Sequence, residues 1–107
     1  MRITKCLGAR DYRECATILI TGAIAASDGD EFVKRTEDVS TARVDLSSVG
    51  GELLAGLEIG EQIHARGFDT NVPAGNICAS SCADIWLAGK NREQGIPFTQ
   101  VRTQLQL

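Results

Sequence analysis

Short β-rich apolar runs alternate with longer stretches of helical periodicity along this chain. The run at 17–20 is rich in β-branched side chains and is followed by Gly22, as expected for a strand that ends in a turn. Residues 52–67 repeat apolar positions every three or four residues, which is typical of a helix. The pattern predicts strands at 2–6, 17–20, 42–48, 68–75 and 98–101, and helices at 27–39, 52–67 and 79–89.

From the second strand onward, strands and helices follow one another with short connections. Such an order is typical of parallel strands joined by right-handed crossovers, so we expect an α/β fold. The 107 residues suit one domain spanning 1–107, without internal repeats, low-complexity tracts or linkers.

The stretch at 52–67 is the clearest helix. Leu53, Leu57 and Gly60 share one face, and Gly56 and Gly60 are four residues apart. Because glycine has no side chain, we expect this side to press closely against a neighbouring element. Gly67 is expected to end the helix.

Composition and charge narrow the classes of partner. The formal net charge of −3 gives no reason to expect a nucleic-acid partner, because phosphate binding needs a basic surface. No apolar stretch reaches the roughly 18 residues that a membrane span needs. Charged residues interrupt residues 1–20, which therefore do not read as a signal peptide. We expect either a cytoplasmic protein or a chain that lacks its export signal.

The four cysteines leave three alternatives open. They stand at positions 6, 15, 78 and 82, and His64 is the single histidine. None of the spacings is the C-x-x-C of a zinc site, so no metal or other cofactor is predicted. Two disulfides need an oxidising compartment, and free buried thiols acting as small hydrophobes are the commoner arrangement.

Two strand–helix junctions are candidates for chemistry. In a parallel sheet, sites form at the carboxyl ends of the strands, where helix N-termini point. In "DLSSVGGEL", Gly50 and Gly51 follow a strand and leave main-chain amides unobstructed. This arrangement is suited to binding an anion or an oxyanion. The alternative is a tight glycine turn without a ligand.

The second junction is "NICASSCADIWLAG", where Ser80 stands near the start of a helix. A serine there usually accepts hydrogen bonds from the first-turn amides as an N-cap. It can instead act as a nucleophile if a base takes its proton. Taken alone, the cap is the commoner role.

Together, the two junctions resemble the Clp protease proteolytic subunit and its relatives on the crotonase-type α/β spiral. That family has a strand, "NSPGG" and a helix, followed by a strand, "AAS" and a helix. This chain has "LSSVGGELLAGLEIGEQI" and then "GNICASSCADIWLAG", and the resemblance extends over 16–92. It is nearest to bacterial cell-envelope Clp-protease-like proteins that carry "CAS-x-C". The resemblance implies a ββα spiral shortened at its C-terminus, a homo-oligomer, a peptide or protein substrate, and a periplasmic location.

The resemblance also implies roles for individual residues. Gly50 and Gly51 match the backbone donors of the oxyanion hole, and Ser80 matches the nucleophile. Cys78 and Cys82 match the flanking cysteines and are expected to form a short disulfide if Cys78 precedes the helix.

One departure from the family changes the functional prediction. The family's catalytic histidine lies beyond the serine helix, whereas this sequence has no histidine after Ser80. His64 is expected to be a partly exposed helix residue. A serine without a base is a poor nucleophile, so we expect a serine-peptidase fold that is catalytically incomplete in this chain. The alternatives are a non-catalytic binding or assembly module and a crotonase-like acyl-CoA site.

Overall fold

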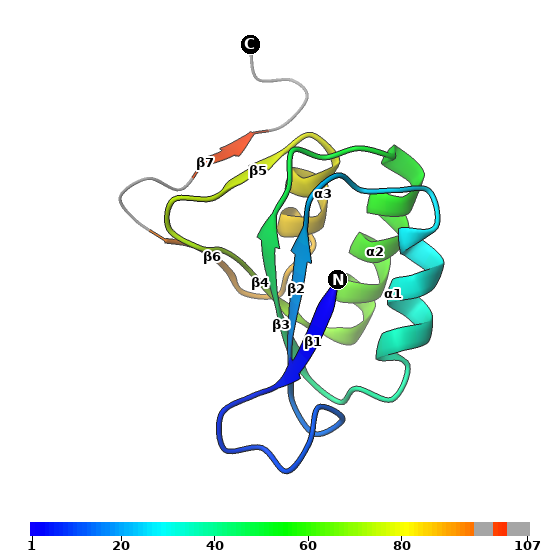
Figure 1. Cartoon of the computed structure of the whole chain (residues 1–107), viewed down its shortest axis with the longest axis vertical. Helices are drawn as coiled ribbons and strands as arrows, with labels where there is room; N and C mark the ends of the chain where they lie inside the picture. The colour runs from blue at the N-terminus through cyan, green and yellow to red at the C-terminus, as the bar shows by residue number, and fades with distance from the viewer. Residues whose placement is uncertain (96–99, 103–107) are drawn as a thin grey trace.

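The computed structural model describes residues 1–95 and the backbone of residues 100–102 (Figure 1). Within these residues, a five-stranded sheet has the order β1-β2-β3-β4-β6 and a two-stranded sheet joins β5 to β7. The strands are β1 (Arg2–Lys5), β2 (Ala16–Thr21), β3 (Ala42–Ser47), β4 (Asp69–Val72), β5 (Ile77–Ala79), β6 (Arg92–Gln94) and β7 (Gln100–Arg102). The helices are α1 (Asp28–Thr36), α2 (Leu53–Arg66) and α3 (Ser81–Leu87).

The centre of the main sheet is parallel, as the alternation of strands and helices predicted. β2 pairs with β3, β3 with β4, and β4 with β6, all in parallel register. β1 differs, because it pairs with β2 in antiparallel register through a loop that contains no helix. An antiparallel pair needs only such a short connection, whereas a parallel pair needs a crossover.

One face of the sheet is buried under the helices and carries the core. Along β2 and β3 every second side chain is buried, while the alternate positions are partly or fully exposed. The side chains from this face pack with α2 and with two buried phenylalanines, Phe32 and Phe68. Figure 1 shows α1 and α2 side by side next to the sheet.

α2 does not bury the face that carries its leucines. Leu53 and Leu57 are 44% and 45% exposed, whereas the side with Ala55 and Ile59 is buried. The expected close approach at the glycines is confirmed. A Cβ placed on Gly56 would lie 2.9 Å from the Cβ of Ser81 in α3.

Three short strands, β5, β6 and β7, do not coincide with strands whose bounds the sequence predicted. β6 was not predicted, whereas β5 lies at the expected strand–helix junction in 76–89, for whose strand no bounds were predicted. The strand predicted at Phe98–Val101 falls partly on residues 98–99, which lie outside the described residues, and Gln100–Arg102 form β7. β7 pairs with β5 in parallel register.

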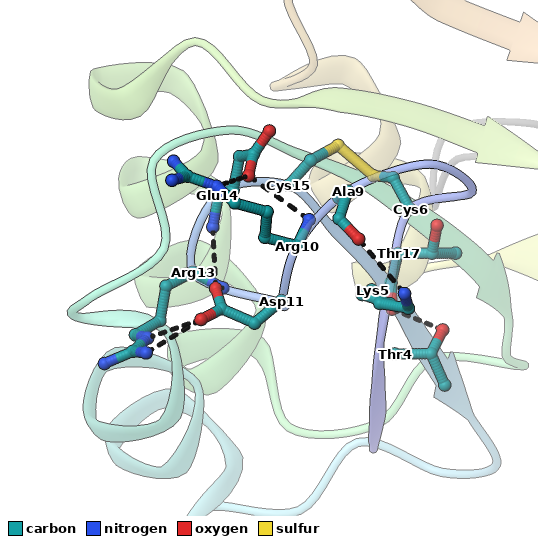
Figure 2. Close-up of a disulfide and its surroundings, with 10 residues drawn as sticks. All are labelled: Thr4, Lys5, Cys6, Ala9, Arg10, Asp11, Arg13, Glu14, Cys15 and Thr17. Carbon is teal, nitrogen blue, oxygen red and sulfur yellow. Dashed lines mark hydrogen bonds and ion pairs between the residues drawn. A yellow bond between two sulfur atoms is a disulfide. The ribbon is translucent and has the colours of Figure 1, made fainter.

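All four cysteines form disulfides, so the alternative of free buried thiols is wrong. The Cys6–Cys15 bond closes the connection between β1 and β2 (Figure 2). Inside that loop, Arg13 donates hydrogen bonds to Asp11 and thereby lowers the pKa of the Asp11 carboxyl. Arg10 pairs with Glu14 in the same loop. The loop is therefore held by one covalent bond and by local ion pairs.

Arg66, in the last turn of α2, joins that helix to the end of α1. Its guanidinium donates to the hydroxyl of Thr36 at 2.8 Å, to the carbonyl of Thr36, and to the carbonyl of Val39 at 2.7 Å. It also lies over the ring of Phe68, 4.6 Å from the centroid. Desolvation by burial lowers the pKa of the Arg66 guanidinium. A cation in this position adds a charged donor to carbonyls at and just beyond the end of α1, where the Thr36 carbonyl also accepts from the Val39 amide at 3.0 Å.

Candidate functional site

The glycine turn after β3 is built from main-chain contacts. Gly50 and Gly51 have φ angles of +96° and +147°, which side chains disfavour. The amide of Ile24 donates to the carbonyl of Gly50 at 2.9 Å, and the amide of Glu52 donates to the carbonyl of Ile24 at 2.9 Å. A Cβ on Gly51 would lie 2.3 Å from the Ile24 carbonyl oxygen, so this turn requires glycine.

Ser48 organises the same turn. Its hydroxyl donates to the carbonyl of Gly22 at 2.6 Å and accepts from the amide of Gly50 at 3.0 Å. The Gly50 amide therefore has an internal acceptor, whereas the Gly51 amide has none within residues 1–95. The amide that can donate to a ligand is that of Gly51.

Ser80 occupies a strained turn between β5 and α3. Its φ of 56° and ψ of −127° make it the one non-glycine residue with positive φ in the described part of the chain. Such a conformation costs about 1–3 kcal/mol and tends to occur at functional sites. Ser80 stands at the N-cap position, but its side chain accepts no hydrogen bond from the first-turn amides. The side chain of Ser80 therefore does not cap α3.

The two junctions lie against each other. A Cβ on Gly50 would lie 2.8 Å from the Ser80 Cβ, 2.7 Å from the Ala79 carbonyl oxygen and 3.2 Å from the Ser81 nitrogen. β5 reaches this position through a parallel bridge between Ser48 and Cys78. The glycine turn and the serine turn therefore form one site beyond the carboxyl end of β3.

Two main-chain amides belong to the turns that meet at this site, those of Gly51 and Ser81. Ser81 is the first residue of α3, and the first amides of a helix have no acceptor within the helix. The Gly51 amide belongs to the turn that packs on Ser80. Main-chain amides without an internal acceptor are able to donate to an anionic ligand.

His64 does not belong to this site. Gly56 contacts Ser81 at the start of α3, and His64 follows Gly56 by eight residues, which is about 12 Å along a helix. Its exposed side chain lines a shallow groove between α2 and α3 together with Asp84. Asp84, four residues after Ser80, thus faces that groove. Among the described residues, no cluster of three or more metal-ligating side chains is found.

Cys78 and Cys82, each two residues from Ser80 along the chain, form the second disulfide. Cys78 lies in β5 and therefore precedes the helix, which is the condition for a short bond. The two Cα atoms are 5.2 Å apart, and both cysteines are fully buried. Of the residues proposed from the sequence, Gly50, Gly51, Ser80 and this cysteine pair are therefore brought together.

Two contributors to the site were missed by sequence reasoning. The hydroxyl of Ser48 orders the glycine turn, and the serine two residues before Gly50 was a local signal for such a turn. The backbone of Ile24 forms hydrogen bonds with the residues on either side of Gly51, and no sequence signal pointed to this contact.

The topology and the paired junctions define the class of protein: the chain has the ClpP-type α/β fold. An asparagine-to-aspartate mutant of ClpP1 from Listeria monocytogenes superimposes with a TM-score of 0.65 and 26% sequence identity, over 78% of this chain and 52% of that one. This protein is thus similar in fold to a ClpP subunit and spans about half of its length.

A second similar structure is a serine-to-alanine mutant of the 1510-N membrane-bound stomatin-specific protease. It aligns with a TM-score of 0.53 and 18% identity, over 68% of this chain and 39% of that one. At this identity the likeness concerns the fold alone. No protein-family model and no curated protein matches the sequence. In the described residues, no helix combines the length and the apolar character that crossing a membrane would require.

Proposed function

We propose that this chain carries the nucleophile and the oxyanion donors of a ClpP-type serine hydrolase that acts on peptide carbonyls. The observation that carries the proposal is the contact between the Gly50 turn and Ser80, with the Ser80 backbone at positive φ. A turn of this kind holds a serine side chain away from the helix amides and toward a substrate.

The proposed reaction begins with attack of the Ser80 oxygen on the carbonyl carbon of a peptide bond. The serine proton passes to a base, and the carbonyl electron pair moves to the oxygen, where the amides of Gly51 and Ser81 stabilise the negative charge. The amine then leaves with a proton, and water hydrolyses the resulting ester. Removing one such amide donor typically lowers kcat by about 10²–10³.

We place the general base outside the described residues, because His64 lies about 12 Å along α2 from Gly56, the residue that contacts Ser81. A second copy of the chain or a further segment of the protein is the proposed source. Without a base the serine retains only slow reactivity, since general-base catalysis typically contributes about 10²–10⁴ in rate.

A fluorophosphonate probe tests the proposal, because a reactive serine displaces the fluoride and forms a stable bond to phosphorus. We expect slow labelling of the intact chain that added imidazole accelerates by about tenfold or more, since imidazole supplies the missing base. The label should map to Ser80 by peptide mass spectrometry and should vanish in Ser80→Ala.

Ser27→Ala is the matched control. Ser27 is also an N-cap serine without a side-chain cap bond, but its backbone has the ordinary φ of −82°. This variant should be labelled at the wild-type rate. Labelling spread over several serines would contradict the proposal, as would a folded chain that is not labelled at any imidazole concentration.

A second candidate is a non-catalytic binding or assembly module of the same fold. The position of His64, about 12 Å along α2 from the residue that contacts Ser81, favours it. Absence of labelling in folded protein would support this candidate over the hydrolase.

We also propose that the chain assembles with further copies of itself through the exposed leucines of α2. Leu54 is 65% exposed, and Leu53 and Leu57 are exposed beside it. Apolar side chains gathered in this way often mark a contact surface. Leu54→Lys should therefore lower the mass measured by light scattering while leaving the circular dichroism spectrum of the folded chain unchanged. A wild-type chain that is monomeric at all concentrations would contradict this.

An oxidising compartment such as the cell envelope is the proposed location. The two disulfides support it, because such bonds rarely persist in the reducing cytoplasm. In protein purified without reductant, no thiol should react with maleimide until the protein is unfolded and reduced. Four reactive thiols in the unreduced protein would contradict the proposal.

A further inference from the structure

The Cys78–Cys82 disulfide closes a very short ring around the candidate nucleophile. Only residues 79–81 lie between the two cysteines, and the strained Ser80 is in the middle. Both cysteines are fully buried beneath the turn, so the bond is shielded from solvent.

The strand at one end of this bond, β5, is also held to the glycine turn. The amide of Ser48 donates to the carbonyl of Ile77 at 2.9 Å, and the amide of Ala79 donates to the carbonyl of Ser48 at 3.0 Å. These hydrogen bonds hold β5 to the residue that orders the glycine turn. Cys82 lies in the first turn of α3, so the disulfide links that turn covalently to β5.

The Cys78–Cys82 bond is better explained by a local effect on the turn than by a contribution to the stability of the whole fold. In the chain-entropy model, a disulfide constrains the unfolded chain more when it closes a longer loop. The Cys6–Cys15 bond joins residues nine apart and the Cys78–Cys82 bond residues four apart, so the shorter one contributes less to global stability. Its specific effect is on the turn that it encloses.

We propose that the Cys78–Cys82 disulfide is a positioning element that holds Ser80 at positive φ, against the Gly50 turn. Without the bond, the turn relaxes toward negative φ, where a serine at the start of a helix caps the first-turn amides. The expected loss of Ser80 reactivity rests on the proposed hydrolase function. The expected change in the backbone conformation of the turn does not depend on that function.

The two disulfides provide a matched comparison in the full chain. One variant carries Cys78→Ala with Cys82→Ala, and the control carries Cys6→Ala with Cys15→Ala. Hydrogen exchange is followed by NMR at the amides of Ala79 and Ala83, because the latter donates to the Ser80 carbonyl at 2.9 Å. We expect exchange at both amides to rise by about tenfold or more in the first variant alone, with the amides of β3 unchanged.

Fluorophosphonate kinetics give the second readout. In the Cys78→Ala, Cys82→Ala variant the maximal labelling rate should fall by about 10²-fold, since a displaced nucleophile loses its alignment. The apparent dissociation constant of the probe should stay near the wild-type value. The control pair should retain the wild-type labelling rate, even where its melting temperature is lower.

Unchanged exchange at Ala79 and Ala83 would overturn the proposal. If the alanine pair does not fold, Cys78→Val with Cys82→Ala fills more of the buried space and is subject to the same criteria. If the wild-type chain itself is not labelled, the hydrolase function fails, and the exchange measurement alone still decides whether the disulfide positions Ser80.

Discussion

Gly51→Ala is expected to lower the free energy of unfolding by about 3 kcal/mol or more, because it combines a steric clash with backbone strain. The new Cβ would lie 2.3 Å from the carbonyl oxygen and 2.8 Å from the nitrogen of Ile24. Both atoms belong to the backbone, so no side-chain rotation relieves the clash. Urea denaturation followed by circular dichroism measures the loss, and labelling of Ser80 should disappear with the displaced turn.

Gly22→Ala separates the clash from the strain. Gly22 also has positive φ, at +78°, but a Cβ there would meet no atom within 4 Å. Its expected cost is about 1–2 kcal/mol, the ordinary penalty for a side chain at positive φ. Equal losses in the two variants would contradict the packing of the glycine turn on Ile24.

Arg66→Met is the second change with a large expected effect, a loss of about 3 kcal/mol in the free energy of unfolding. Methionine retains an apolar stem against Phe68 but leaves the carbonyls of Thr36 and Val39 without their charged donor. The end of α1 should then detach from α2. The melting temperature and hydrogen exchange at the end of α1 measure the effect.

Two further variants control for charge and for exposure. Arg66→Lys keeps the charge but loses the planar fork that serves several acceptors, so it should recover only part of the loss. Arg13→Met removes an exposed arginine whose ion pair with Asp11 is local, and it should change stability by no more than about 1 kcal/mol. If Arg13→Met lowered the free energy of unfolding as much as Arg66→Met, burial of Arg66 would not be the cause of its large effect.

The order of the main elements could be predicted because each long element has a clear period. The predicted α/β fold with ClpP-type topology is confirmed by the structure and by its likeness to ClpP1. β5 and β6 have three residues each, too few to establish an alternation. β6 is also entirely exposed and polar, so it shows no apolar signal. Its place at the sheet edge results from pairing with β4.

The burial of α2 shows a second limit of sequence reasoning. Periodicity identifies which residues share a helix face, but it does not say which face meets the rest of the protein. The buried side carries Ala55, Ile59 and Ile63, so it is as apolar as the side with the leucines, and Gly56 lets α3 approach next to it. Periodicity cannot choose between two apolar faces of one helix.

The candidate site could be predicted in part. The sequence pattern placed Gly50, Gly51 and Ser80 at two junctions, and the structure brings these junctions together. It did not reveal the positive φ of Ser80, which depends on the pairing of β5 and on a disulfide. The internal acceptor of the Gly50 amide was missed for the same reason, because a hydroxyl orientation is a tertiary property.

The turn around Gly51 is shaped mainly by backbone atoms, and this determines which substitutions it tolerates. The contacts that shape it involve the carbonyl and nitrogen of Ile24, the carbonyl of Ala79 and the amide of Ser81. Such a shape depends on a few glycines and on the chain path, so most neighbouring side chains can be exchanged without altering it.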